Sequence, residues 1–310
     1  MHPGMLLIRS RAVSRVLVWL FIAWIPFVTT IDYCSEVRCI EGQHTMCTYS
    51  SDSPGSECVS LTGQGVDSKQ IEDLLHVHNR YRDYLAAGKE TRTLGGAMPE
   101  AANMGVLTWD EEIARIAQRW ALQCHFGHDG CRDLPNMQVG QNVAIAGSSV
   151  SGPPNMTSLA VMWYEKEVGM FDAGGVASYQ FSMQTGHFTQ WIWATSYKIG
   201  CGYAGFKSGM MNNNFLVCNY GPAGNVMRWP IYQQGSPCSA CPRGTTCGGD
   251  SRYPNLCKAE GDEVPGGGGH SAFGEGQYEK LNSGSVPGRS ALLAGLCGAL
   301  VFCASAQLLL

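Results

Sequence analysis

Cysteine number and position constrain this chain more than any other feature. It has 14 cysteines, and two of them follow residue 290 in an apolar segment. The other 12 lie between Cys34 and Cys257, and an even number in an exported chain predicts six disulfides. Metal binding by these thiols is a weaker interpretation, because Cys238-x-x-Cys241 would be half of a zinc ribbon without its second half.

The N-terminal segment has the order of a secretory signal peptide. Positive charges at Arg9, Arg11 and Arg15 precede an apolar stretch, residues 16–28, that is shorter than the ~20 residues a spanning helix needs. We therefore predict that residues 1–30 are a cleaved signal peptide. A signal anchor that stays uncut is the alternative.

The C-terminal segment has the order of a lipid-attachment signal. The small residues Asn282, Ser283 and Gly284 precede an apolar stretch over residues 291–310 that has no Lys or Arg behind it. This order predicts a glycosylphosphatidylinositol (GPI) anchor on one of the three small residues, with residues 285–310 removed. A retained membrane segment is the alternative, although such segments usually carry basic residues on their cytoplasmic flank.

Composition divides the rest of the chain into four parts and argues against nucleic acid as a partner. The parts are a cysteine-rich arm (31–67), a globular core (68–232), a small cysteine-rich hinge module (233–258) and a Gly-rich stalk (259–284). The net charge is -4 without a basic run, whereas phosphate binding needs clustered Lys and Arg.

Apolar periodicity in the core predicts an α+β fold. Three helices are expected, beginning near Asp67 or Ser68, at the capping box Thr108–Glu111, and near Thr157 or Ser158. Two strands are expected over Tyr197–Phe206 and Phe215–Tyr220, with a turn at Asn212–Asn214. Helices flanking a short antiparallel sheet would form an α/β/α sandwich.

Three polar side chains interrupt the apolar pattern. His78 and Glu167 occupy helical positions that the period assigns to apolar residues, and His187 stands among aromatic residues. A buried charge costs several kcal/mol unless it is paired. These side chains therefore either line a cleft or have buried partners, and the second, structural interpretation is the more common one for such residues.

Two long motifs identify a family resemblance. Gly186–Gln190 followed by Trp193, and Phe215–Val226, resemble the two signatures of the CAP family (cysteine-rich secretory, antigen-five and pathogenesis-related proteins). His78–Arg82 resembles the family's first-helix motif. The segments Gly127–Asp133 and Val139–Ala144 are similar to arthropod venom antigen five in particular.

The resemblance implies a disulfide map for the arm and the core. The implied pairs are Cys34–Cys47, Cys39–Cys131, Cys58–Cys124 and Cys201–Cys218, and the last also follows from the predicted hairpin. In the hinge module, Cys238–Cys247 and Cys241–Cys257 are chosen from three connectivities.

The resemblance also implies a central cleft with two histidines and, in many members, two glutamates. Carried over, these are His78, His187 and Glu167, while the second glutamate is replaced by Gln141. Two imidazoles and one carboxylate could bind a divalent metal such as zinc. Gln141 is neutral and is a poorer ligand and a poorer base than a carboxylate.

Two alternative functions are predicted. A binding protein for lipid, sterol or extracellular protein ligands, exported and anchored at the cell surface, is favoured over an enzyme because one cleft carboxylate is missing. The alternative is a metal-dependent hydrolase or peptidase that uses His78, His187 and Glu167. Asn155-Met156-Thr157 is a glycosylation sequon in a Pro-rich loop.

Overall fold

The computed structural model describes the chain between its predicted signals. The described residues are 31–37, 39, 43–149, 155–248 and 250–259, and the backbone of 306–309. The predicted signal peptide, nearly all of the stalk and most of the C-terminal signal lie outside the described residues. All elements below belong to one compact unit, Asp32–Leu310.

A mixed sheet forms the middle layer of this unit, in the order β1-β4-β5-β3-β8, with β2 beside β4. Its antiparallel centre is the pairing of β4 with β5 and of β5 with β3. Four residues of the predicted C-terminal signal form β8, which pairs antiparallel with β3. The strands are β1 (Leu61–Gln64), β2 (Thr108–Trp109), β3 (Gly140–Ser148), β4 (Lys198–Ser208), β5 (Met211–Gly221) and β8 (Ala306–Leu309).

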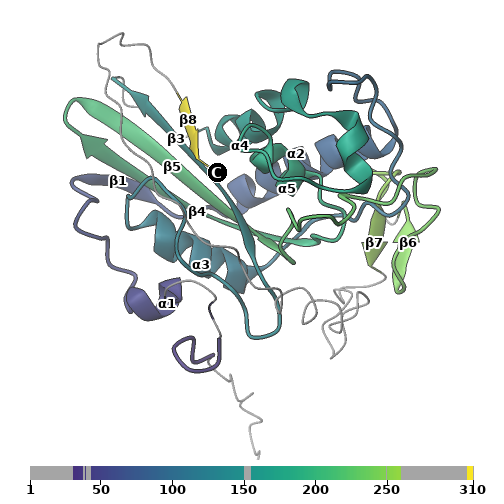
Figure 1. Cartoon of the computed structure of the whole chain (residues 1–310). Coiled ribbons are helices and arrows are strands. Elements are labelled where there is room, and N and C mark those ends of the chain that lie inside the picture. The colour runs from purple at the N-terminus through teal and green to yellow at the C-terminus, as the bar shows by residue number, and fades with distance from the viewer. Residues whose placement is uncertain are drawn as a thin grey trace, which may run out of the picture. The chain divides into compact units, whose positions relative to one another are not determined.

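Helices cover both faces of the sheet, which confirms the predicted α/β/α sandwich (Figure 1). One face packs against α3 (Glu111–Ala121) and the other against α2 (Ser68–Ala86), α4 (Met156–Glu165) and α5 (Gly186–Trp191). The smaller elements are α1 (Thr45–Thr48), the 3₁₀ helices η1 (Val168–Met170) and η2 (Ala173–Ala177), and the hairpin of β6 (Thr245–Cys247) with β7 (Cys257–Ala259). Within the described ranges, no helix is long and apolar enough to cross a bilayer.

Helix α3 lies directly against β4 because two glycines of that strand leave room for it. A Cβ on Gly200 would overlap the backbone of Ala114, and a Cβ on Gly202 would overlap the backbone of Gln118. Ile113, Ile116 and other apolar residues of α3 are fully buried at this contact. The close approach therefore depends on the missing side chains of β4.

Helix starts agree with the sequence at one site and differ at two. Asp67 caps α2, as predicted, and it also forms a full capping box with Gln70. The cap of α3 is Asp110 and not Thr108, and the cap of α4 is Asn155 and not Thr157 or Ser158. In both corrected cases an Asp or Asn side chain accepts the backbone N–H three residues later, the geometry that makes these residues strong caps.

The β4–β5 hairpin turns at Gly209 and Met210, not at the predicted asparagine run. Gly209 has φ +59°, a left-handed conformation that glycine adopts without steric cost. Asn212 instead lies inside β5, paired with Lys207 on β4 and with Ser148 on β3. The asparagines are strand residues because the turn chemistry is already supplied by glycine.

Six disulfides join the pairs that the resemblance and the hinge reasoning implied. They are Cys34–Cys47, Cys39–Cys131, Cys58–Cys124, Cys201–Cys218, Cys238–Cys247 and Cys241–Cys257. Cys257 of the last pair also connects the hinge module to the core, because its backbone N donates to Met104 O at 2.8 Å.

Candidate functional site

His187, a residue of α5, and Glu167 form a buried side-chain contact. His187 Nδ1 lies 2.6 Å from Glu167 Oε1, and Phe188 N donates to Glu167 Oε2 at 2.8 Å. Both oxygens of the carboxylate are therefore engaged. Glu167 is not on the predicted helical face, because α4 ends at Glu165 and Glu167 lies in the turn before η1. A tertiary partner, and not helical position, explains why this charge is buried.

His78 has a structural environment, with a protein partner at each ring nitrogen. The ring is fully buried, Nδ1 donates to Leu74 O at 2.7 Å, and Nε2 accepts from the Tyr220 hydroxyl at 2.9 Å. Burial lowers the pKa of His78 to about 3, so the imidazole is neutral. Its ring stacks on Trp191 with centroids 3.7 Å apart. Because Leu74 O and the Tyr220 hydroxyl occupy both nitrogens of His78, its predicted role as a metal ligand with His187 and Glu167 remains a prediction.

Arg82, from the same first-helix motif, orders the segment that follows α5. Its guanidinium is fully buried and donates to five backbone carbonyl oxygens, those of Gly105, Trp191, Trp193, Ala194 and Ser196. Burial lowers the pKa of Arg82 to about 9. The carbonyl groups, in place of a carboxylate, compensate the buried charge and hold Trp191 against His78.

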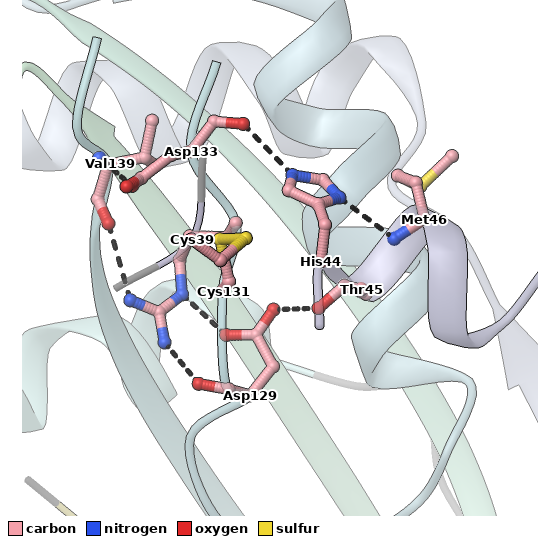
Figure 2. The surroundings of a disulfide bond; sticks show 9 residues. Cys39, His44, Thr45, Met46, Asp129, Cys131, Asp133 and Val139 are labelled. Carbon is pink, nitrogen blue, oxygen red and sulfur yellow. Dashed lines mark hydrogen bonds and ion pairs between the residues drawn. A yellow bond between two sulfur atoms is a disulfide. The ribbon is translucent and has the colours of Figure 1, made fainter. Parts of the chain in front are cut away.

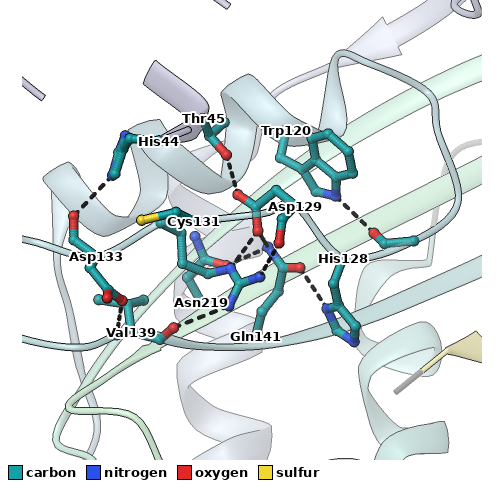
Figure 3. A network of polar contacts seen from close by, with 12 residues as sticks. His44, Thr45, Trp120, His128, Asp129, Cys131, Asp133, Val139, Gln141 and Asn219 are labelled. Atoms are coloured by element: carbon teal, nitrogen blue, oxygen red, sulfur yellow. Dashed lines mark hydrogen bonds and ion pairs between the residues drawn. The ribbon is translucent and has the colours of Figure 1, made fainter. Parts of the chain in front are cut away.

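His128, which sequence reasoning missed, is the histidine that lies next to Gln141. His128 Nδ1 is 2.7 Å from Gln141 Oε1 (Figure 3). Burial lowers the pKa of His128, and the positive charge of Arg132 lowers it further, while the contact with Gln141 opposes this shift. In the sequence, the similarity of the Gly127–Asp133 segment to antigen five pointed to this region, but no functional role was assigned to His128.

Gln141 is held in one orientation by acceptors on both sides of its amide nitrogen. Gln141 Nε2 donates to Asp129 Oδ1 at 3.1 Å and to Asn219 Oδ1 at 3.0 Å. The amide oxygen must then face His128, and the ring donates from Nδ1. Asp129 also pairs with Arg132. A carboxylate at position 141 would face the carboxylate of Asp129, so the buried Asp129 favours an amide there.

The cysteine-rich arm is connected to this network through α1. The Cys39–Cys131 disulfide lies beside it, and the Thr45 hydroxyl donates to Asp129 (Figure 2). His44 donates from Nε2 to Asp133 O at 2.9 Å and accepts from Met46 N at Nδ1 at 3.0 Å. The arm and the residues around His128 are thus one hydrogen-bonded unit.

Two buried histidines, His128 and His187, have the same arrangement at Nδ1. His128 and His187 each have an acceptor at Nδ1, which places the lone pair on Nε2, the arrangement found around metal-binding histidines. In the hinge module, the sulfurs of Cys238, Cys241 and Cys257 lie within 4.8 Å of one another. All three are in disulfides and are not thiolate ligands.

Three exposed apolar side chains lie on the segment 181–183 and at Met227, and together these are here called the 181–183/227 patch. Phe181 is 54% exposed, Met183 74% and Met227 47%. Phe181 N donates to Met227 Sδ at 3.3 Å, which places the two segments together. Adjacent apolar residues of this size on a surface mark a contact site more often than isolated ones do.

The sandwich, the six disulfides and the buried histidines define a cysteine-rich secretory type of protein. A sequence profile described as "CAP: Cysteine-rich secretory protein family" matches residues 75–220. The chain belongs to this family, and its similarity to arthropod antigen five is confirmed by the following relatives.

Venom allergens of other species are similar to this chain over most of their own length. Venom allergen 5 of Brachyponera chinensis is 45% identical over 194 residues, 61% of this chain and 97% of the relative. Venom allergen 5.02 of Dolichovespula maculata is 42% identical over 208 residues, 66% and 94% of the two chains. The crystal structure of Na-ASP-1 has a TM-score of 0.52 and 33% identity, covering 66% of this chain and 50% of that one.

Proposed function

We propose that the chain is an extracellular CAP protein that binds its ligands without hydrolysing them. One observation carries this proposal: both oxygens of Glu167 are held by N–H donors, and position 141 is an amide. A hydrolase of this kind would need a carboxylate placed to take a proton from water or to bind the metal. Metal-dependent turnover of peptide or ester substrates that Glu167→Gln abolishes would overturn the proposal.

The ligand class supported best is a lipid or sterol that contacts the 181–183/227 patch. Burial of one large apolar side chain stabilises a contact by roughly 1.5–3 kcal/mol. Phe181 and Met183 expose most of their surface, so a ligand that covers them gains this energy. An extracellular protein ligand is the other class that the family resemblance implied, and binding of sterol unaffected by changes in the patch would favour it.

A fluorescent sterol titrated into the purified protein tests the lipid proposal. Phe181→Ser and Met183→Ser should each raise the Kd about 10–100-fold, since 1.4 kcal/mol corresponds to a factor of ten. Met210→Ser is the matched control, because Met210 is 92% exposed on the β4–β5 turn, away from the patch in sequence. Equal effects of the control and the patch variants would contradict the proposal.

His128 and His187 are the residues proposed to hold a divalent ion such as zinc. The ion would act there as a Lewis acid when bound, and the chain's contribution is to fix the two tautomers through Gln141 and Glu167. Calorimetric titration of zinc should show at least tenfold weaker binding for His128→Ala. His125→Ala, an exposed histidine three residues away, is the control. Unchanged binding by His128→Ala would contradict this assignment.

Export and surface anchoring are proposed from the sequence signals and the disulfides. The similar proteins are named as venom allergens, and six disulfides suit an oxidising compartment. Residues 1–30 are the proposed signal peptide, and Asn282, Ser283 or Gly284 the proposed GPI attachment site. Phosphatidylinositol-specific phospholipase should release the protein from cells, and retention after treatment would favour a membrane segment.

A further inference from the structure

We infer that Asn155 carries an N-linked oligosaccharide while its side-chain oxygen caps α4. Asn155-Met156-Thr157 is the only Asn-x-Ser/Thr sequence of the chain. Asn155 is exposed, and it is the last residue before α4. The modification goes beyond the proposed ligand binding and does not depend on it.

The two functional groups of the Asn155 amide have separate roles. Oδ1 accepts from Ser158 N at 2.9 Å and completes the first turn of the helix. Nδ2 has no hydrogen-bond partner among the residues that the structure describes, so substitution on it breaks no described contact. An N-linked sugar keeps the amide oxygen as an acceptor, and the cap is therefore compatible with the modification.

The neighbouring residues anchor the site without covering it. Met156 is buried in the apolar core at the start of α4, while Asn155 and Ser158 remain exposed. The first turn of the helix is thus fixed from below, and its outer side is open to solvent. A bulky hydrophilic sugar is accommodated at such a position because it displaces only water.

The transfer requires a lipid diphosphate-linked oligosaccharide, the donor class used in the secretory pathway. The Asn155 Nδ2–C1 bond to the first sugar forms as the C1–O bond to the diphosphate breaks. One amide proton is lost, and the lipid diphosphate leaves. The amide nitrogen keeps its second proton and the carbonyl oxygen is unchanged.

Mass spectrometry of the full chain secreted from a eukaryotic host tests the inference. The wild type and Thr157→Ser should carry the sugar mass, and peptide N-glycosidase should remove it and leave aspartate at position 155. Thr157→Ala should lack the sugar mass although the Asn155 cap is intact. Asn155→Asp should also lack it while keeping a cap acceptor.

Thermal unfolding separates loss of the sugar from loss of the cap. Asn155→Asp and Thr157→Ala should both lack the sugar mass while they keep a cap. Asn155→Ala removes both the sugar and the cap, and it should unfold at a lower temperature than Asn155→Asp. A wild type secreted at its unmodified mass would overturn the inference. Equal unfolding temperatures for Asn155→Ala and Asn155→Asp would overturn the capping role.

Discussion

Gln141→Glu should destabilise the protein in a way that depends on pH. In the wild type, Gln141 Nε2 donates two hydrogen bonds, to Asp129 Oδ1 at 3.1 Å and to Asn219 Oδ1 at 3.0 Å. A glutamate replaces this donor by an oxygen, so both contacts become oxygen against oxygen. Leaving a buried partner unsatisfied costs roughly 1–3 kcal/mol for each group. We expect the variant to lose about 2–4 kcal/mol of unfolding free energy at pH 8.

Acid should reduce this loss. The nearby carboxylate of Asp129 raises the folded-state pKa of a glutamate at position 141 above its unfolded value of about 4.3. The folded variant then binds a proton that the unfolded chain does not, and stability falls as pH rises between the two values. Protonated, the new side chain can donate one hydrogen bond to Asp129 again. The loss should therefore shrink to about 1 kcal/mol near pH 4.5.

Urea unfolding of variant and wild type at pH 4.5 and pH 8, with disulfides intact, measures the difference directly. Gln184→Glu adds the same charge at an exposed position and should change stability by less than about 0.5 kcal/mol at either pH. Wild-type stability of Gln141→Glu at pH 8, or the same loss at both pH values, would refute the argument that Asp129 requires an amide at position 141.

Three further perturbations test the core around the site. Neutral His78 contributes stability that is complete above its unfolded pKa of 6.5 and is lost as pH falls toward its folded pKa of about 3. Urea unfolding should therefore show that the free energy of unfolding declines less between pH 7 and pH 4 in His78→Gln than in the wild type. Arg82→Met should cost about 3 kcal/mol or more, because five carbonyl groups lose their donor, whereas the exposed Arg80→Met should cost less than about 0.5 kcal/mol by the same assay. Gly202→Ala should cost about 3 kcal/mol because its Cβ meets the α3 backbone, while Gly63→Ala, whose Cβ would lie 3.6 Å from Tyr203, should be milder; equal unfolding midpoints for the two would contradict this packing.

Local motifs were sufficient for the fold class and for the presence of the three main helices, although only one of their starts was placed correctly. Asp67 is a predicted cap that the structure confirms, because a cap depends on residues three apart in the chain. The cap of α4 was misplaced because Asn155, Thr157 and Ser158 are all good caps. Which one acts is decided by how far the apolar face of the helix extends, and here Met156 is buried one residue after the cap.

The site was only half predictable. His187, which stands among aromatic residues, and Glu167 were both singled out from the sequence, and they are in contact although Glu167 lies outside the helix. His78 was singled out by the same rule, but its partners are Leu74 O and the Tyr220 hydroxyl. Apolar periodicity shows that a side chain is buried, and it does not show which other side chain it faces.

The sequence by itself determined the disulfide-bonded scaffold and the family, because cysteine count, signatures and caps are written in short stretches of chain. Only the tertiary structure decided that His128 is the histidine beside Gln141. His128 comes from the segment after α3 and Gln141 from β3, and they meet because the fold returns that segment to the sheet. A contact between layers depends on packing in three dimensions, for which the spacing of residues along one chain carries no direct signal.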